Sequence, residues 1–164
     1  MKTIQGWIGC CLLAPCISSA SCWEEAGRNY GIDPLLLQAV GWKESRGWSH
    51  AVGPMLKDGN QALGVMQINT IHLPALAAFN IRRQDLFDAC TSQKVGAWVL
   101  SDCIKTFGST WKAVGCYYAG PKSKAVTAQV AYVQDVQRFY AAYCQQQTPA
   151  LKTALVDVVN GSTN

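Results

Sequence analysis

The sequence predicts a mainly α-helical protein, and three observations support this. Apolar residues recur at the three- and four-residue spacing of a helix in several segments. Residues that favour helix ends flank these segments, such as Asp33-Pro34 at one start and Gly108 just past one end. No segment shows the convincing alternation of apolar and polar residues that is typical of a strand. The only β-structure we allow for is a small hairpin in the loop at 52–63.

The first two predicted helices lie close together in the chain. The first is short and covers 23–30. The second begins at Pro34 under an Asp33 cap, and its residues through Trp42 are almost all apolar. A helix that is apolar on nearly every side is expected in the core. Gly47 is the predicted stop.

The middle of the chain predicts a loop and several shorter elements. A glycine-rich loop is expected at 47–64, a short helix after it through Met66 and Ile68, and a further helical turn at 74–79. The remaining helices are predicted at 95–107, at 111–118 with Thr110 as the cap, and at 123–144.

The domain organisation is predicted to be simple. Residues 1–20 have the order of a secretory signal peptide: basic Lys2, a short apolar stretch and small residues up to Ala20. The alternative is an uncleaved anchor, but the stretch is shorter than the ~20 apolar residues that span a bilayer. We expect one domain at 21–144 and a flexible C-terminal tail at 145–164.

Charge and cysteine content narrow the class of protein. The formal net charge is only +4, and Arg82-Arg83 is the only adjacent basic pair, so nucleic-acid binding is not expected. Five cysteines follow the signal peptide, an odd number in an oxidising compartment, and their connectivity stays open. They are Cys22, Cys90, Cys103, Cys116 and Cys144. None shows zinc-type spacing, so no metal is predicted.

Glu44 is the candidate catalytic acid. It lies in the last predicted turn of the apolar helix, where burial and the negative end of the helix dipole both disfavour a charged carboxylate. Both effects raise the pKa, as suits a group that must hold a proton near neutral pH. The alternative is an exposed glutamate paired with Lys43 or Arg46.

Three segments together carry a family resemblance. Glu44-Ser45, Gly-Val-Met-Gln-Ile-Asn at 64–69 and Tyr117–Gly120 resemble the lysozyme-like lytic transglycosylases of bacteria. The small exported members that accompany type III or type IV secretion and conjugation systems are the most similar. The resemblance covers most of 22–143. It implies a fold like that of goose-type lysozyme, a periplasmic location, and peptidoglycan strands and a secretion or conjugation machine as partners.

The resemblance also implies a reaction that needs no cofactor. Such enzymes cut the β-1,4 bond between N-acetylmuramic acid (MurNAc) and N-acetylglucosamine (GlcNAc) without water, leaving a 1,6-anhydromuramoyl end. Glu44 would act first as acid and then as base, so one carboxyl suffices where ordinary glycosidases use two. The residues implied to bind or orient substrate are Ser45, Gly64, Met66, Gln67, Asn69, Tyr117 and Tyr118.

The sequence departs from the family pattern at one site residue, and the resemblance also implies a disulfide. The usual Ala-Tyr-Asn-Ala-Gly has Tyr118 in place of its asparagine, which puts one sugar contact in doubt. The resemblance pairs Cys22 with Cys90. We expect Cys103 to pair with Cys144 and Cys116 to be buried with a free thiol.

Two other functions stay open. A hydrolytic muramidase that uses water would need a second carboxylate, for which Asp58 is the nearby candidate, although a glycine-flanked aspartate is more often a turn residue. A non-catalytic protein that binds glycan or acts as a scaffold would not need Glu44. His50 and His72 match no motif and are interpreted as surface or loop residues.

Overall fold

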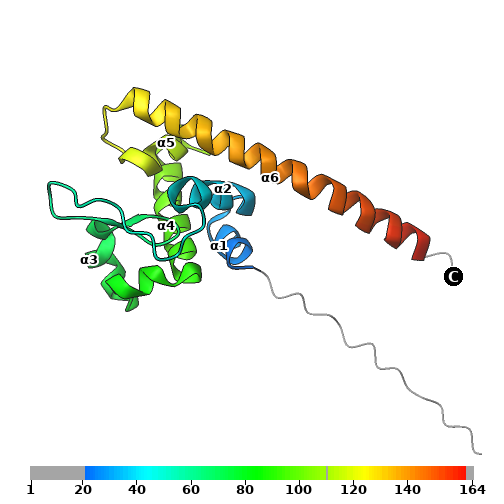
Figure 1. Ribbon diagram of the computed structural model, residues 1–164, viewed down its shortest axis with the longest axis horizontal. Helices are drawn as coiled ribbons and strands as arrows, with labels where there is room; N and C mark the ends of the chain where they lie inside the picture. The colour runs from blue at the N-terminus through cyan, green and yellow to red at the C-terminus, as the bar shows by residue number, and fades with distance from the viewer. Residues whose placement is uncertain (1–20, 110, 162–164) are drawn as a thin grey trace, which may run out of the picture.

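The computed structural model of the protein describes residues 21–109 and 111–161 (Figure 1). The predicted signal peptide at 1–20 and the predicted cap Thr110 lie outside these residues. The fold is mainly helical, as predicted, and comprises α1 Cys22–Tyr30, α2 Pro34–Ser45, β1 Ala62–Leu63, β2 Ile68–Asn69, η1 Thr70–His72, α3 Leu73–Leu76, η2 Ala77–Phe79, η3 Arg83–Phe87, α4 Ala89–Phe107, α5 Trp111–Ala119 and α6 Val126–Gly161. None of the described helices is long and apolar enough to cross a membrane.

Helix α2 is the central helix, as its apolar sequence predicts. The carboxylate of Asp33 accepts a hydrogen bond from the backbone N–H of Leu35 at 2.8 Å and so caps the helix start. Leu37 and Val40 are fully buried. The helix ends at Ser45, because Arg46 already takes the left-handed conformation with φ 56°, one residue before the predicted stop at Gly47.

The segment after Gly64 is a β-hairpin, so the predicted short helix through Met66 and Ile68 is wrong. Strands β1 and β2 pair in antiparallel register with Leu63 opposite Ile68. The chain reverses because Gly64 and Gln67 have φ values of +75° and +48°, which no right-handed helix contains. The predicted hairpin is therefore present, although it lies later in the chain than 52–63. Only a single bridge, between Val52 and Leu63, reaches back into that loop.

Two helices are longer than predicted. Helix α4 begins at Ala89, where the Asp88 carboxylate accepts a hydrogen bond from the N–H of Thr91 at 2.8 Å. Helix α6 continues past the expected end at 144 and past Pro149 to Gly161. The segment predicted as a flexible tail is thus helical through Gly161, and Figure 1 shows it extending beyond α1 and α2.

The first predicted disulfide is confirmed and the second is wrong. Cys22 in α1 pairs with Cys90 in α4. Cys103 pairs with Cys116, not with Cys144. The reason is tertiary: Cys103 on α4 and Cys116 on α5 are both buried where these helices pack together, whereas Cys144 lies on α6. Cys116 is therefore buried as predicted, but disulfide-bonded.

This correction predicts different effects for two cysteine variants. Cys103→Ala opens a loop with a sequence separation of 13 residues. We expect it to lower the free energy of unfolding by about 3 kcal/mol. Cys144→Ala leaves both disulfides intact and should lower it by less. Denaturant unfolding of the two variants measures the difference, and equal losses would support the Cys103–Cys144 pairing.

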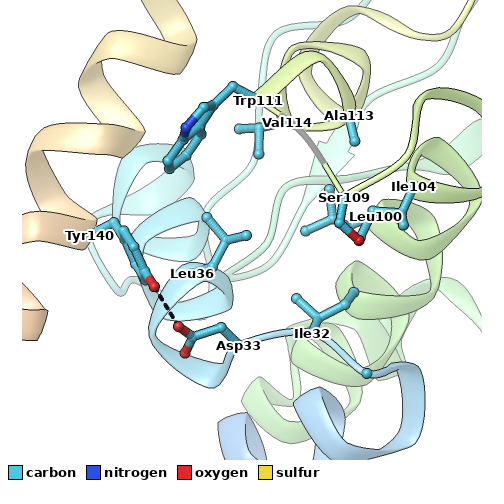
Figure 2. A pocket seen from close by; sticks show the side chains of 11 residues that line it. Ile32, Asp33, Leu36, Leu100, Ile104, Ser109, Trp111, Ala113, Val114 and Tyr140 are labelled. Atoms are coloured by element: carbon cyan, nitrogen blue, oxygen red, sulfur yellow. Dashed lines mark hydrogen bonds between the residues drawn. The ribbon is translucent and has the colours of Figure 1, made fainter.

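Helices α2 and α6 are joined at two places far apart along α2. Near the start of α2, the hydroxyl of Tyr140 donates a hydrogen bond to the Asp33 carboxylate at 2.6 Å (Figure 2). This bond lies beside a cavity of about 310 Å³ that Leu36 and Trp111 also line. Near the end of α2, the Lys43 ammonium contacts the Asp135 carboxylate at 2.5 Å. Together these contacts hold α6 along α2 and thereby fix what α6 presents to Glu44.

Candidate active site

Glu44 is half-buried in the last turn of α2 and is hydrogen-bonded to α6. Its Oε1 accepts a hydrogen bond from the hydroxyl of Tyr132 at 2.5 Å. Tyr132 is only 4% exposed, so this bond is largely shielded from water. Sequence reasoning missed Tyr132 as a site residue. The available signal was the helical spacing of Tyr132 with the apolar residues Val136 and Phe139, since a tyrosine on a core-facing side needs a partner for its hydroxyl.

The protonation of Glu44 agrees with the role predicted for it. Burial raises the pKa of its carboxyl to about 7, while the hydrogen bond from Tyr132 and the charge of Lys43 act in the opposite direction. A carboxyl with this pKa is protonated in a substantial fraction of molecules near neutral pH. It can therefore give up a proton and later take one back.

Two buried tyrosines interact electrostatically with this carboxyl. Burial raises the pKa of both Tyr117 and Tyr132 well above the usual range, and the charge of Glu44 raises it further. Both phenols therefore remain protonated hydrogen-bond donors. The Tyr117 hydroxyl donates to the Met66 carbonyl at 2.8 Å. Tyr117 thus ties α5 to the hairpin, and Tyr132 is the tyrosine that touches Glu44.

Tyr118, which by the resemblance stands where an asparagine was expected, contacts the site through Tyr132. The two rings are stacked, with centroids 4.8 Å apart and an interplanar angle of 19°. Tyr118 is half exposed, so one part of its ring faces solvent while another part covers the buried Tyr132. The substitution therefore supplies an aromatic support for the tyrosine that binds Glu44.

The three polar residues that were expected to bind substrate all make hydrogen bonds within the protein. The Ser45 hydroxyl lies 2.8 Å from the Val65 carbonyl, to which it donates. The Gln67 amide nitrogen donates to the carbonyls of Gly64 at 3.0 Å and Ala51 at 3.2 Å. The Asn69 side chain accepts from the Ile71 N–H at 2.9 Å and caps η1. The Ser45 bond ties the end of α2 to the hairpin, whereas the bonds of Gln67 and Asn69 hold the hairpin and the turn that follows it.

Two residues expected at the glycan surface are packing residues instead. Met66 is fully buried, so its side chain does not line a sugar groove. It fills the space between α2 and α4, where a Cβ on Gly96 would lie 2.6 Å from its Cε. Gly64 is also buried, and a Cβ there would lie 2.0 Å from the Leu86 carbonyl oxygen. Gly64 therefore permits close packing against Leu86, and not the approach of a glycan.

The remaining candidates lie apart from this cluster. Asp58 is fully exposed, and hydrogen bonds from Asn60 lower its pKa, as in a turn. His50 is exposed and stacks on Phe87. His72 is half-buried against Trp98, and burial lowers its pKa. None has an interaction with Glu44 among those found in the described part of the chain.

The raised pKa of Glu44 predicts a stability cost at neutral pH. The folded state holds this proton up to about pH 7, whereas a glutamate in the unfolded chain loses it near pH 4.5. Stability should therefore fall as pH rises through that window. Glu44→Gln removes the ionisable group and should unfold with a free energy about 3 kcal/mol higher than the wild type at pH 8, and nearly equal at pH 4. Denaturant unfolding at both pH values tests this, and a gap that does not change with pH would contradict it.

Comparisons with known proteins show the family of the chain. The family model described as "Transglycosylase SLT domain" matches residues 21–139. "X polypeptide" of Escherichia coli K12 is 35% identical over 154 residues, covering 89% of each chain. "Invasion protein IagB" of Salmonella typhimurium LT2 is 37% identical over 122 residues, covering 74% of this chain and 76% of its own. "Protein IpgF" of Shigella flexneri is 32% identical over 127 residues, covering 77% and 83%. The chain therefore belongs to the transglycosylase SLT family and is a lytic transglycosylase.

Proposed function

We propose that this enzyme cuts the β-1,4 bond between MurNAc and GlcNAc in peptidoglycan and leaves a 1,6-anhydromuramoyl end. The observation that supports this best is the half-buried Glu44 carboxyl with a pKa of about 7, hydrogen-bonded to Tyr132. A single carboxyl that exchanges a proton near neutral pH has the properties that both halves of the reaction require.

In the first half, protonated Glu44 gives its proton to the glycosidic oxygen. The bond from the MurNAc C1 to that oxygen breaks, and the GlcNAc leaves with a free hydroxyl. In the second half, the Glu44 carboxylate takes the proton of the MurNAc C6 hydroxyl while O6 bonds to C1. The ring closes without water, and Glu44 is protonated again for the next cycle. Tyr132 donates its hydrogen bond most strongly to the carboxylate that exists between the halves.

Hydrolysis with a second carboxylate has less support. An inverting glycosidase needs its base about 6.5–9.5 Å from the acid, and a retaining one needs its nucleophile closer. Asp58 was the nearby candidate, but its carboxylate is fully exposed and accepts the backbone N–H of Asn60 at 3.1 Å. Its surroundings are those of a turn residue.

We also propose that the enzyme is exported to the periplasm and opens the cell wall locally for a secretion or conjugation apparatus. Peptidoglycan lies outside the cytoplasmic membrane, which agrees with the signal peptide predicted at 1–20 and with two disulfides in the fold. One relative is named an invasion protein. Fractionation of cells that express the protein with or without residues 1–20 tests the export, and only the version with residues 1–20 should reach the periplasm.

Mass spectrometry of the products tests the reaction. Purified peptidoglycan should be digested by the protein lacking residues 1–20, and the soluble fragments analysed with and without borohydride reduction. We expect anhydromuramoyl ends, which are one water lighter than reducing ends and resist reduction. Reducing ends would show hydrolysis, and Asp58→Asn would then be the next variant to test.

A further inference from the structure

A solvent-exposed apolar groove lies between α5 and the first half of α6, apart from Glu44. Its volume is about 530 Å³. Val126, Val130 and Val133 of α6 line it together with Phe107 and Trp111. Val126 is 64% exposed and Val130 is 50% exposed, although both are β-branched apolar residues that usually favour burial. Figure 1 shows α5 beside this part of α6, with the long end of α6 pointing away from it.

The groove is bordered by positive charge. Lys112 lines it, and exposed Lys122 and Lys124 alternate with Pro121 and Ser123, which also line it. The sequence has no aspartate or glutamate between Asp102 and Asp135. Among the described residues that form the groove, none is acidic. An apolar floor with a cationic border fits a ligand that is apolar on one side and anionic beside it.

The spacing of the valines fits a helix as the ligand. Val126, Val130 and Val133 stand at positions i, i+4 and i+7 of α6. Seven residues of helix rise about 10 Å, which is also the length over which a second helix presents anchors at i, i+4 and i+7. A helix that lies in the groove between two others is a common mode of peptide recognition.

Other occupants fit less well. The chain's own segment 145–164 carries one lysine and one aspartate and so lacks the negative charge. A second copy would bring the same lysines face to face in a two-fold contact. An anionic lipid surface would attract the lysines but would not fill a groove between two helices.

We propose that this groove docks an acidic amphipathic helix of a partner protein. The partner inserts apolar side chains against the three valines and places carboxylates beside Lys112, Lys122 and Lys124. Glu44 does not line the groove, so the docked helix is not expected to contact it. The inference does not depend on the proposed product of the reaction. Binding of such a partner would localise the enzyme to the assembly that contains the partner.

A designed peptide tests the groove directly. The probe is a fluorescein-labelled helix of about 16 residues, long enough to be partly helical alone, with leucines at i, i+4 and i+7 and glutamates beside them. Fluorescence anisotropy gives its affinity. We expect Val130→Glu to weaken binding about 10-fold or more, because a buried apolar contact is replaced by a like charge. Lys112→Glu should weaken it about 5-fold.

Matched controls distinguish the effect of substitutions in the groove from the effect of the same changes in charge and apolarity elsewhere on the surface. Phe79→Glu in η2 and Arg28→Glu in α1 change exposed residues that do not line the groove, and should bind within about 2-fold of the wild type. A peptide with lysines in place of the glutamates should bind about 10-fold more weakly.

Several results would overturn the docking proposal. One is the absence of binding up to about 1 mM peptide, and another is equal binding by all four variants. A third is dimerisation of the protein that Val130→Glu abolishes, and a fourth is sedimentation with phosphatidylglycerol vesicles that Val130→Glu abolishes. Slower peptidoglycan cleavage by Val130→Glu would instead make the groove part of the substrate site. If the wild type binds the peptide as expected but releases no anhydromuramoyl ends, the docking inference stands and the proposed function fails.

Discussion

Glu44→Gln should reduce the release of soluble fragments from peptidoglycan by about 1,000-fold or more. Glutamine has nearly the same shape and can still accept the hydrogen bond from Tyr132, but it can neither give a proton to the glycosidic oxygen nor take one from the C6 hydroxyl. Both halves of the reaction are therefore lost together. Turbidity of a peptidoglycan suspension and mass spectrometry of the supernatant measure the effect.

Asp58→Asn is the matched control for this variant. It also changes one carboxylate to an amide, but Asp58 is fully exposed in a turn. We expect its rate to stay within about 2-fold of the wild type, as for most surface substitutions. A loss comparable to that of Glu44→Gln would instead indicate two catalytic carboxylates and a hydrolase. If Glu44→Gln cleaves peptidoglycan at the rate of the wild type, Glu44 has no part in the mechanism.

Tyr132→Phe should produce the second largest effect, and the effect should depend on pH. The hydroxyl of Tyr132 lowers the pKa of Glu44, so its removal raises that pKa above about 7. Because cleavage begins with protonated Glu44, the alkaline limb of the pH profile of kcat/KM should move to higher pH. The maximal rate should fall by about 10- to 100-fold, because the carboxyl loses the contact that orients it.

Tyr117→Phe provides the comparison for this shift. It also removes one buried phenolic hydroxyl, but that hydroxyl donates to the Met66 carbonyl and not to Glu44. It should lower stability by about 1–2 kcal/mol without moving the alkaline limb. The role assigned to Tyr132 would be wrong if Tyr132→Phe leaves the limb in place, or if both variants move it equally.

Local patterns in the sequence were sufficient to predict the scaffold around the site. The Asp33-Pro34 start and the apolar run after it predicted α2 and its central position, because capping and burial depend on residues within one helix. The same local reading placed Glu44 in the last turn of that helix and gave the direction of its pKa shift. The family resemblance added the reaction class and the Cys22–Cys90 disulfide.

Other features depended on contacts between elements far apart in the chain. The hairpin replaced a predicted helix because Gly64 packs against the Leu86 carbonyl and Gln67 adopts a positive φ, neither of which leaves a periodic signal. Met66 was assigned to substrate binding by the family resemblance, and its burial between α2 and α4 depends on contacts that a single apolar residue does not reveal. Cys103 pairs with Cys116 because α4 packs on α5, a neighbour relation that cysteine spacing does not encode.

The sequence by itself was enough to predict the helical fold class and to select Glu44 as the candidate catalytic carboxyl, because these predictions rest on residue type and local helix geometry, while the family resemblance implied the reaction. Tertiary structure alone decided which groups surround that carboxyl. Tyr132 lies 88 residues from Glu44 in the chain, and its hydroxyl reaches the carboxylate only because α6 is held along α2 by Lys43–Asp135 and Tyr140–Asp33. Tyr118 then supports Tyr132 from α5. The acid comes from one helix, but its orientation and proton affinity come from how three helices pack.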